Sequence, residues 1–333
     1  MTPATPSSTA VAMAFLRAHH ARHADPKIFD DYLAASLIAP EECARFEFRA
    51  IDALHRLRPD VDTFKLDSAT LLRKALRARG AQAEIIARAR FTEDRLLSAL
   101  QDGVSQYVIL GAGLDTFALR RADLRDRLTV FEIDLPAFQD SKRARLAAAG
   151  LACPPNLQFL AADFERESVA DVLLRSAYRR DRRSFFFSWL GVTFYLSSEA
   201  VFEVLRSIHR VATPGSLLAF DYIDLDGFDP AKASLQIREI MNTVRQAGEP
   251  MISGFDPRRL AVNLAQLGFR VVENVDPAQQ QQQYFSGRTD GLHATEHFHF
   301  VLAEVIEKHR RQLMVRVSGN PGSNQRPGFK GEG

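Results

Sequence analysis

Residues 107–116 read Y-V-I-L-G-A-G-L-D-T, and this stretch decides the fold expected for the chain. The first four residues have the length and the β-branched or aromatic character of a buried strand. Gly111 and Gly113 allow the backbone to turn sharply and to approach a ligand closely. Because a buried strand that ends in a glycine-rich turn is typical of nucleotide-binding α/β folds, the stretch predicts a cofactor site.

The sequence after this turn alternates between strand-like and helix-like segments, which predicts a parallel sheet with helices on both faces. Two late strand-like segments without an obvious helix between them predict an antiparallel end to the sheet. The predicted strands are 129–133, 157–160, 184–188, 216–222, 269–275 and 298–305, and the predicted helices are 137–149, 168–178, 198–211 and 257–267.

The domain organisation follows from the same patterns. Residues 1–83 are predicted to form a helical N-terminal cap, with helices over 10–20, 28–38, 42–57 and 68–79. A cofactor-binding domain is expected over 84–308, and residues 224–256 interrupt it as an insertion over the carboxyl edge of the sheet. Residues 279–283 are predicted to be a polar loop, and 317–333 a disordered tail.

Composition excludes several classes of protein. The 333 residues are 46% hydrophobic and 25% charged, which is ordinary for a globular protein. A formal charge of +2 argues against a nucleic-acid partner. Cys43 and Cys153 are far apart and predict neither a disulfide framework nor a zinc site. No apolar run approaches the ~18 residues needed to cross a bilayer, so we expect a cytoplasmic protein without membrane contact.

The glycine turn departs from the dinucleotide-binding pattern. Thr116 stands where the third glycine would fall, and Asp115 would place a like charge beside a pyrophosphate. The turn therefore favours a cofactor that carries an amine or hydroxyl groups. The alternative interpretation is a tight strand-to-helix turn with a solvated Asp115.

Acidic residues also follow the next two strands. Asp134 lies roughly twenty residues past the glycines, where an acid binds a ribose diol in such folds, and Glu132 shares its strand face. Asp163 could accept a hydrogen bond from an adenine amine while Phe164 covers the ring. The alternatives are a surface acid at a strand end for Asp134, and a packed aromatic beside a surface acid for the second pair.

Five segments in this order resemble the leucine carboxyl methyltransferase family, in particular its bacterial branch of S-adenosylmethionine-dependent methyltransferases. They are R-A-R-F-T-E-D at 88–94, V-I-L-G-A-G-L-D-T-F at 108–117, F-E-I-D-L-P at 131–136, A-A-D-F at 161–164 and W-L-G-V-T-F-Y-L at 189–196. The similarity covers about residues 10–305. It implies the class I methyltransferase fold, a seven-stranded and mostly parallel α/β sheet with an antiparallel last strand. At 188–190 the chain reads S-W-L, where more distant members carry an acid before the glycine.

The resemblance also implies S-adenosylmethionine as the cofactor and a role for each matching residue. Arg88 would pair with the methionine carboxylate, with Arg90 as the alternative. The glycines would pass under the methionine portion near its amino group, and the later acids would bind the ribose and the adenine. The implied cofactor-binding set is Arg88, Gly111, Ala112, Gly113, Asp115, Asp134, Asp163 and Phe164.

The expected reaction is O-methylation of a small molecule or a peptide. A carboxylate is the favoured acceptor because it is already ionised and needs no general base, whereas a hydroxyl would need one. Tyr195 is a candidate for orienting the acceptor and is equally well explained as a packed aromatic. The rival hypotheses are a nicotinamide-dependent oxidoreductase, which Asp115 and Thr116 disfavour, and a non-catalytic binding module. The acceptor and the oligomeric state stay open.

The pattern H-x-x-x-H-x-H at 293–299 raises the hypothesis of a metal site. His299 lies in an alternating strand pattern, no cysteine is near, and Glu296 would face away from His297 and His299. The sequence therefore predicts no metal.

Overall fold

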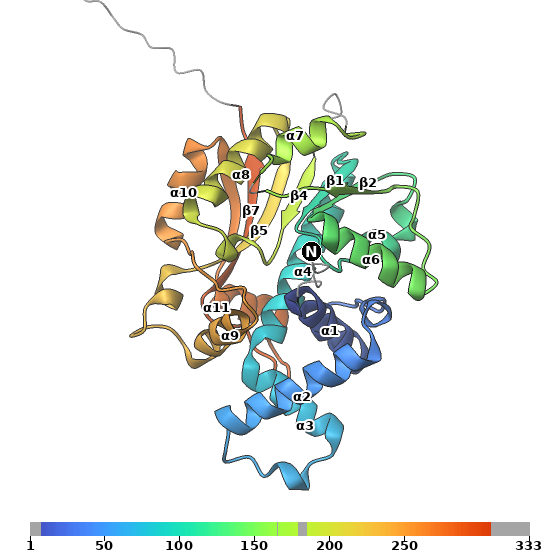
Figure 1. Cartoon of the computed structure of the whole chain (residues 1–333). Helices are drawn as coiled ribbons and strands as arrows, with labels where there is room; N and C mark the ends of the chain where they lie inside the picture. Colours follow the sequence, from blue (N-terminus) through green and yellow to red (C-terminus); the bar gives the residue numbers. More distant parts are fainter. Residues whose placement is uncertain (1–7, 165, 179–184, 308–333) are drawn as a thin grey trace, which may run out of the picture.

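A seven-stranded sheet lies at the centre of the computed structural model, which describes residues 8–164, 166–178 and 185–307 (Figure 1). The strand order is β3-β2-β1-β4-β5-β7-β6, and only β7 runs antiparallel to its neighbours. The fold class predicted from the sequence is confirmed. The strands are β1 (Gln106–Leu110), β2 (Thr129–Asp134), β3 (Leu157–Ala161), β4 (Phe186–Trp189), β5 (Leu217–Ile223), β6 (Phe269–Val275) and β7 (Phe298–Val305).

Helices cover both faces of the sheet because its central strands are apolar on both sides. One core joins the sheet to α7, α8 and α10, and the other joins it to α4 and α5. The helices are α1 (Ser8–His23), α2 (Pro40–Leu57), α3 (Ser68–Arg79), α4 (Ala81–Gln101), α5 (Phe117–Arg120), α6 (Pro136–Ala148), α7 (Val169–Leu174), α8 (Ser198–Val211), α9 (Leu235–Gln246), α10 (Pro257–Gln266) and α11 (Pro277–Gln280).

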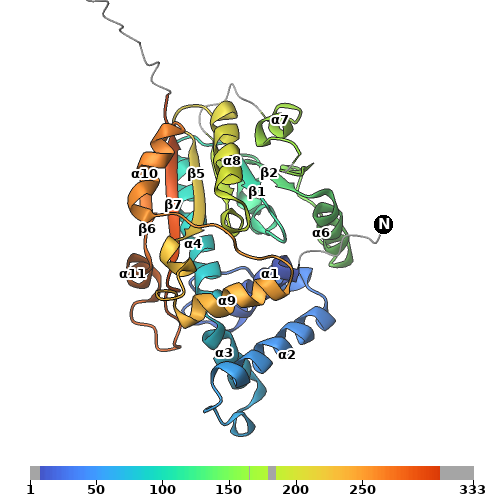
Figure 2. The same ribbon diagram turned by 60° about the vertical axis from the view of Figure 1, so that its left-hand side comes forward.

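The helices α1, α2, α3 and α9 lie together beyond the carboxyl ends of the parallel strands (Figures 1 and 2). The first three share an apolar core of their own, and α9 of the insertion packs against α3. Gly80 separates α3 from α4 by adopting φ 74°, a left-handed conformation that suits glycine. The cap and the insertion are thus brought over the edge of the sheet where ligands bind in such folds.

Two sequence predictions are wrong. Residues 28–38 do not form a helix, and only Ala34–Leu37 makes a 3₁₀ turn, because the loop carries Asp31 into a buried ionic network described below. Residues 279–283 are helical rather than a loop, since α11 continues into a π-helical turn, Gln281–Phe285. The buried Gln280 side chain holds this turn by donating to the carbonyls of Val275 and Phe298. The predicted tail at 317–333 and Ser184 of the fourth predicted strand lie outside the described residues.

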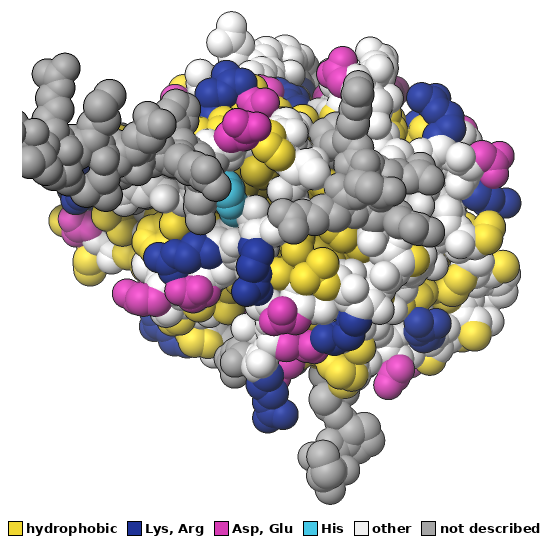
Figure 3. Space-filling model, turned by 90° about the horizontal axis from the view of Figure 1, so that it is seen from above, with side chains coloured by type: hydrophobic (Ala, Val, Ile, Leu, Met, Phe, Trp, Pro, Cys, Tyr) yellow, Lys and Arg dark blue, Asp and Glu magenta, His cyan; other side chains and the backbone are white. Residues whose placement is uncertain are grey.

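Within the described residues, no helix is long and apolar enough to cross a membrane. The same residues contain no cluster of three or more His, Cys, Asp and Glu side chains arranged to hold a metal ion. His297 and His299 instead contact opposite oxygens of Asp224, at 2.9 and 3.3 Å. On the face seen from above in Figure 3, basic and acidic side chains are interspersed rather than gathered by sign.

Candidate cofactor and acceptor site

A cavity of about 650 Å³ lies at the carboxyl ends of the parallel strands. Its size falls in the usual range for small-molecule sites. The cavity brings together every site residue predicted from the sequence, although they come from α4, from three strand ends and from the segment after β4. These residues are Arg88, Gly111, Ala112, Gly113, Asp115, Asp134, Asp163, Phe164 and Tyr195.

The glycine turn is held by the neighbouring strand and packed tightly against the segment after β4. The Gly111 N–H donates to the Ile133 carbonyl at 2.9 Å. A Cβ atom on Gly111 would lie 2.7 Å from Cγ2 of Val192, and the residue has φ 68°. Glycine is therefore required at this position for space as well as for backbone conformation.

Asp134 is bonded to the glycine turn. Its Oδ2 accepts from the Gly113 N–H at 2.6 Å, and its Oδ1 accepts from the Leu135 N–H at 2.8 Å. Burial raises the pKa of Asp134, and the two backbone bonds oppose this shift. Each carboxylate oxygen can accept a further hydrogen bond. Glu132, on the same strand face, is instead buried in an ion pair with Lys142 and does not line the cavity.

The other predicted residues take simpler positions. Asp115 Oδ1 accepts from the Phe117 N–H at 2.7 Å, which fixes the carboxylate at the start of α5. Asp163 is partly exposed and lies 3.4 Å from the Arg166 guanidinium. Phe164 is partly buried against the core between the sheet and α8. These predicted residues therefore line one cavity, and their hydrogen bonds depend on the fold.

Arg88 is buried and pairs with two carboxylates. Its Nη1 donates to Glu84 at 2.6 Å and to Asp221 at 2.8 Å, and Asp221 also accepts from the Gly191 N–H at 2.7 Å. Burial raises the pKa of Glu84 above its ordinary value. Arg90, the alternative to Arg88, pairs with Asp94 and does not line the cavity.

Sequence reasoning missed both partners of Arg88. Glu84 stands one helical turn before Arg88, a spacing that favours an ion pair on a helix. Asp221 is a single acid within the apolar strand β5 and is fully buried. A buried carboxylate needs a charged or hydrogen-bonding partner, and that was the available signal for this residue.

A buried ionic network lines the cavity beside the glycine turn. Asp31 accepts from Thr116 Oγ1 at 2.6 Å and from Arg17 Nε at 2.8 Å. Arg120 donates to Thr116 Oγ1 at 2.8 Å and pairs with Glu93. Thr116, which departs from the dinucleotide pattern, therefore carries a hydroxyl that the network uses.

A second cavity, of about 860 Å³, lies between the N-terminal cap and α9. The two cavities share lining residues, among them Arg88, Gly191 and Tyr195. The Tyr195 ring packs edge-on against Phe194 with ring centroids 4.8 Å apart. Its hydroxyl makes no hydrogen bond to any residue in the described part of the chain, and burial raises the pKa of Tyr195. This shared wall is where a cofactor and an acceptor could meet.

Comparison with known proteins identifies the family of the chain. The model of the leucine carboxyl methyltransferase family matches residues 10–209. The chain belongs to this family. The resemblance inferred from the ordered motifs is therefore confirmed.

Similar bacterial proteins extend the match beyond residues 10–209. A Bacillus subtilis protein, named "Putative S-adenosyl-L-methionine-dependent methyltransferase YktD", is 33% identical over 89% of this chain and 97% of its own length. A Frankia alni protein with the same description is 30% identical, over 73% of this chain and 78% of its own length. A solved structure of a DUF574 family protein from Streptomyces avermitilis is alike in fold, with a TM-score of 0.51 and 15% identity over 88% of this chain and 96% of that one.

Proposed function

We propose that this S-adenosylmethionine-dependent methyltransferase transfers its methyl group to a carboxylate of a small molecule or a peptide. One observation carries the assignment of the cofactor cavity, namely the 2.6 Å bond between the Gly113 N–H and Asp134. It joins the glycine turn and the acid at the end of β2 into a single unit at the strand ends. The cofactor would lie along this unit, and the acceptor would occupy the cavity beneath the cap.

The residues of the smaller cavity suit S-adenosylmethionine. Asp134 keeps free acceptor positions for two ribose hydroxyls, and Phe164 offers an aromatic face to the base. Among the described residues, the Nη2 group of Arg88 hydrogen-bonds only to Met13 Sδ, at 3.9 Å, so it can also donate to the methionine carboxylate. Asp115 supplies a negative charge for the amino group. The bound cofactor provides a methyl group already activated as a sulfonium.

The protein then has to position the acceptor and exclude water, which can supply several kcal/mol of the barrier. Arg88, Gly191 and Tyr195 form the wall that both cavities share, and the Tyr195 hydroxyl is a donor that could orient an acceptor oxygen. No histidine lines either cavity in the described part of the chain. A carboxylate acceptor fits this arrangement because it is ionised without a general base.

Two measurements test the proposal. Calorimetry should detect S-adenosylhomocysteine binding to the intact protein, and the lack of binding would overturn the assignment. Cell extract incubated with the protein and methyl-labelled S-adenosylmethionine should yield a labelled product that releases labelled methanol in mild base, as methyl esters do. A label that resists base would contradict carboxyl methylation and favour a hydroxyl acceptor.

The rival hypotheses predict different results in the same measurements. Binding of NADH without binding of S-adenosylhomocysteine would favour the oxidoreductase. Cofactor binding without transfer to any component of the extract would favour the non-catalytic module. The Asp134→Ala variant serves as the background control for label incorporation.

A further inference from the structure

The larger cavity has an arginine-rich end, at which Arg79 has no carboxylate partner among the described residues. Four arginines of the cap line it, Arg45, Arg49, Arg56 and Arg79. Arg56 forms an ion pair with Asp52. Arg79, at the end of α3, forms no ion pair with any carboxylate of the described residues, and Glu239 of α9 attracts it only from farther away.

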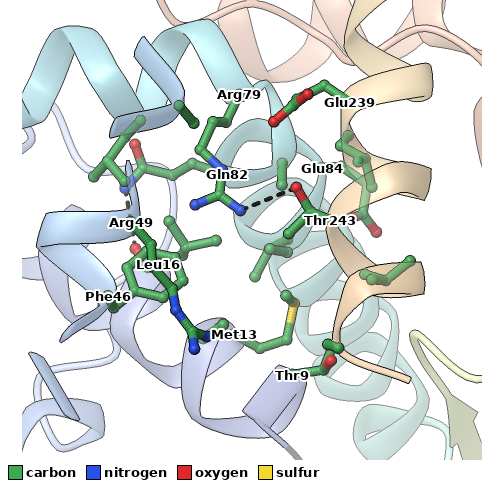
Figure 4. A pocket seen from close by; sticks show the side chains of 18 of the residues that line it. Thr9, Met13, Leu16, Phe46, Arg49, Arg79, Gln82, Glu84, Glu239 and Thr243 are labelled. Carbon is green, nitrogen blue, oxygen red and sulfur yellow. Dashed lines mark hydrogen bonds between the residues drawn. The ribbon is translucent and has the colours of Figure 1, made fainter. Parts of the chain in front are cut away.

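The surroundings of Arg79 hold its guanidinium in place. The Nη2 group donates to Thr243 Oγ1 at 3.3 Å, and the guanidinium lies over the Phe46 ring at 5.5 Å from its centroid. Figure 4 shows the side chain extending into the cavity between α9 and the cap, with Arg49 also directed inward. Burial lowers the pKa of Arg79. A cation held partly buried without a charged partner is costly, and an anionic ligand would offset this cost.

The other two arginines of α3 have different hydrogen-bond partners. Arg77 pairs with Asp290 at 3.1 Å and donates to Gln82 at 2.6 Å. Arg73 is exposed and donates to Thr70 of its own helix at 3.1 Å. Neither lines the cavity. Among the three arginines of α3, Arg79 is therefore the one that lines the cavity, and it does so partly buried and without an ion pair to a described residue.

The cavity between its two ends is mostly apolar. Leu16, Phe46, Ile240, Val244 and Met251 line it. Arg79 lies across the cavity from Thr9 and Met13, which line the cofactor cavity as well (Figure 4). A ligand that reaches from the shared wall to Arg79 must have an apolar body and a charged end.

We propose that the acceptor is an elongated, largely apolar molecule with two anionic groups. One group is the carboxylate that receives the methyl group beside Arg88 and Tyr195, and the other is an anionic group bound by Arg79 with help from Arg49 at the rim. This inference rests on the proposed function, because the shared wall is taken as the place of transfer. Arg79 would then distinguish dianionic acceptors from monoanionic ones of equal length.

Calorimetric titration of the full-length protein loaded with S-adenosylhomocysteine tests the inference. The probes are sebacic and dodecanedioic acids, with decanoic and dodecanoic acids as their monoanionic counterparts. The dianions should bind about tenfold or more tightly than the monoanions, as expected for a hydrogen-bonded charge pair. Arg79→Met should abolish this preference, Arg79→Lys should keep part of it, and the matched variant Arg73→Met should leave it unchanged.

Equal binding of dianions and monoanions by the native protein would overturn the inference, as would a preference that survives in Arg79→Met. Failure of a dianion to bind at all would do the same. Arg79→Met should bind S-adenosylhomocysteine as tightly as the native protein, so loss of the anion preference is distinguishable from failure of the proposed function. If S-adenosylhomocysteine does not bind, the same titrations without it still compare anion binding by the native protein and by Arg79→Met.

Discussion

Gly191→Ala provides a sharp test of how Arg88 is held at the wall between the two cavities. Gly191 has φ 70°, and a Cβ atom there would lie 2.6 Å from Nη2 of Arg88 and 3.0 Å from its Cζ. The guanidinium cannot retreat easily because Glu84 and Asp221 both accept hydrogen bonds from its Nη1. The methyl group must therefore displace Arg88 from its partners.

The expected loss of unfolding free energy in Gly191→Ala has two parts. A left-handed conformation at a residue other than glycine costs about 1–2 kcal/mol. Disturbing a buried ion pair adds up to about 3–5 kcal/mol. If Nη2 of Arg88 binds the cofactor carboxylate, the lost hydrogen bond between charged groups is worth about 1.5–3 kcal/mol, or about 10- to 150-fold in the dissociation constant of S-adenosylhomocysteine.

Gly150→Ala is the matched control. Gly150 has φ 66°, so alanine there carries the same backbone strain, but its Cβ would meet no atom within 4 Å. Urea unfolding should show a loss of about 1–2 kcal/mol for Gly150→Ala and a clearly larger loss for Gly191→Ala. Calorimetry should show weaker S-adenosylhomocysteine binding only for Gly191→Ala. Equal stability and equal binding in the two variants would refute the role assigned to the contact between Gly191 and Arg88.

Three further predictions concern the same site. Asp134→Ala should weaken S-adenosylhomocysteine binding about 10- to 150-fold in calorimetry, while Asp140→Ala on the exposed side of α6 should not; equal affinities would remove Asp134 from the cofactor site. Thr116→Val should lower the unfolding free energy measured in urea by about 1–3 kcal/mol, because buried Asp31 loses a donor; an unchanged value would show that Arg17 and Arg120 suffice. Burial raises the pKa of Glu84 to about 8, above its ordinary value of 4.5, so the folded protein holds this proton more tightly and Glu84 should lower stability as the pH rises between these two values. Urea unfolding across this range should show less decline in Glu84→Gln than in the native protein, and identical slopes would contradict the assignment.

Much of the fold could be predicted from local sequence. Strands such as β1 are apolar on both faces, and helices such as α8 begin at a serine cap and carry one apolar stripe, so their positions follow from periodicity. The mostly parallel sheet also follows, because strands that alternate with helices pair in parallel. The segment 28–38 failed as a helix because the partners of Asp31 lie on α1 and beside the glycine turn, which local propensity does not register.

The cavity at the strand ends could be located from sequence for a related reason. The carboxyl ends of parallel strands meet at one edge of the sheet, so Gly111, Asp134 and Asp163 had to be neighbours once their strands were recognised. The choice between Arg88 and Arg90 was different, since both lie on the same helix. Only the packing of α4 decided which of them lines the cavity, by burying Arg88 beside Glu84 and Asp221 and leaving Arg90 at the surface with Asp94.

By itself, the sequence determined the element order, the glycine turn and the acids that follow the strands, because these depend on spacing within short segments. Only the tertiary structure decided which acidic side chains pair with Arg88 and which residues bond to the Thr116 hydroxyl. It also decided where an acceptor can lie. The larger cavity is built from α1, α2, α3 and α9, and the bond between Arg79 and Thr243 joins residues 164 positions apart. Contacts of that kind form only when the cap and the insertion pack against each other over the sheet.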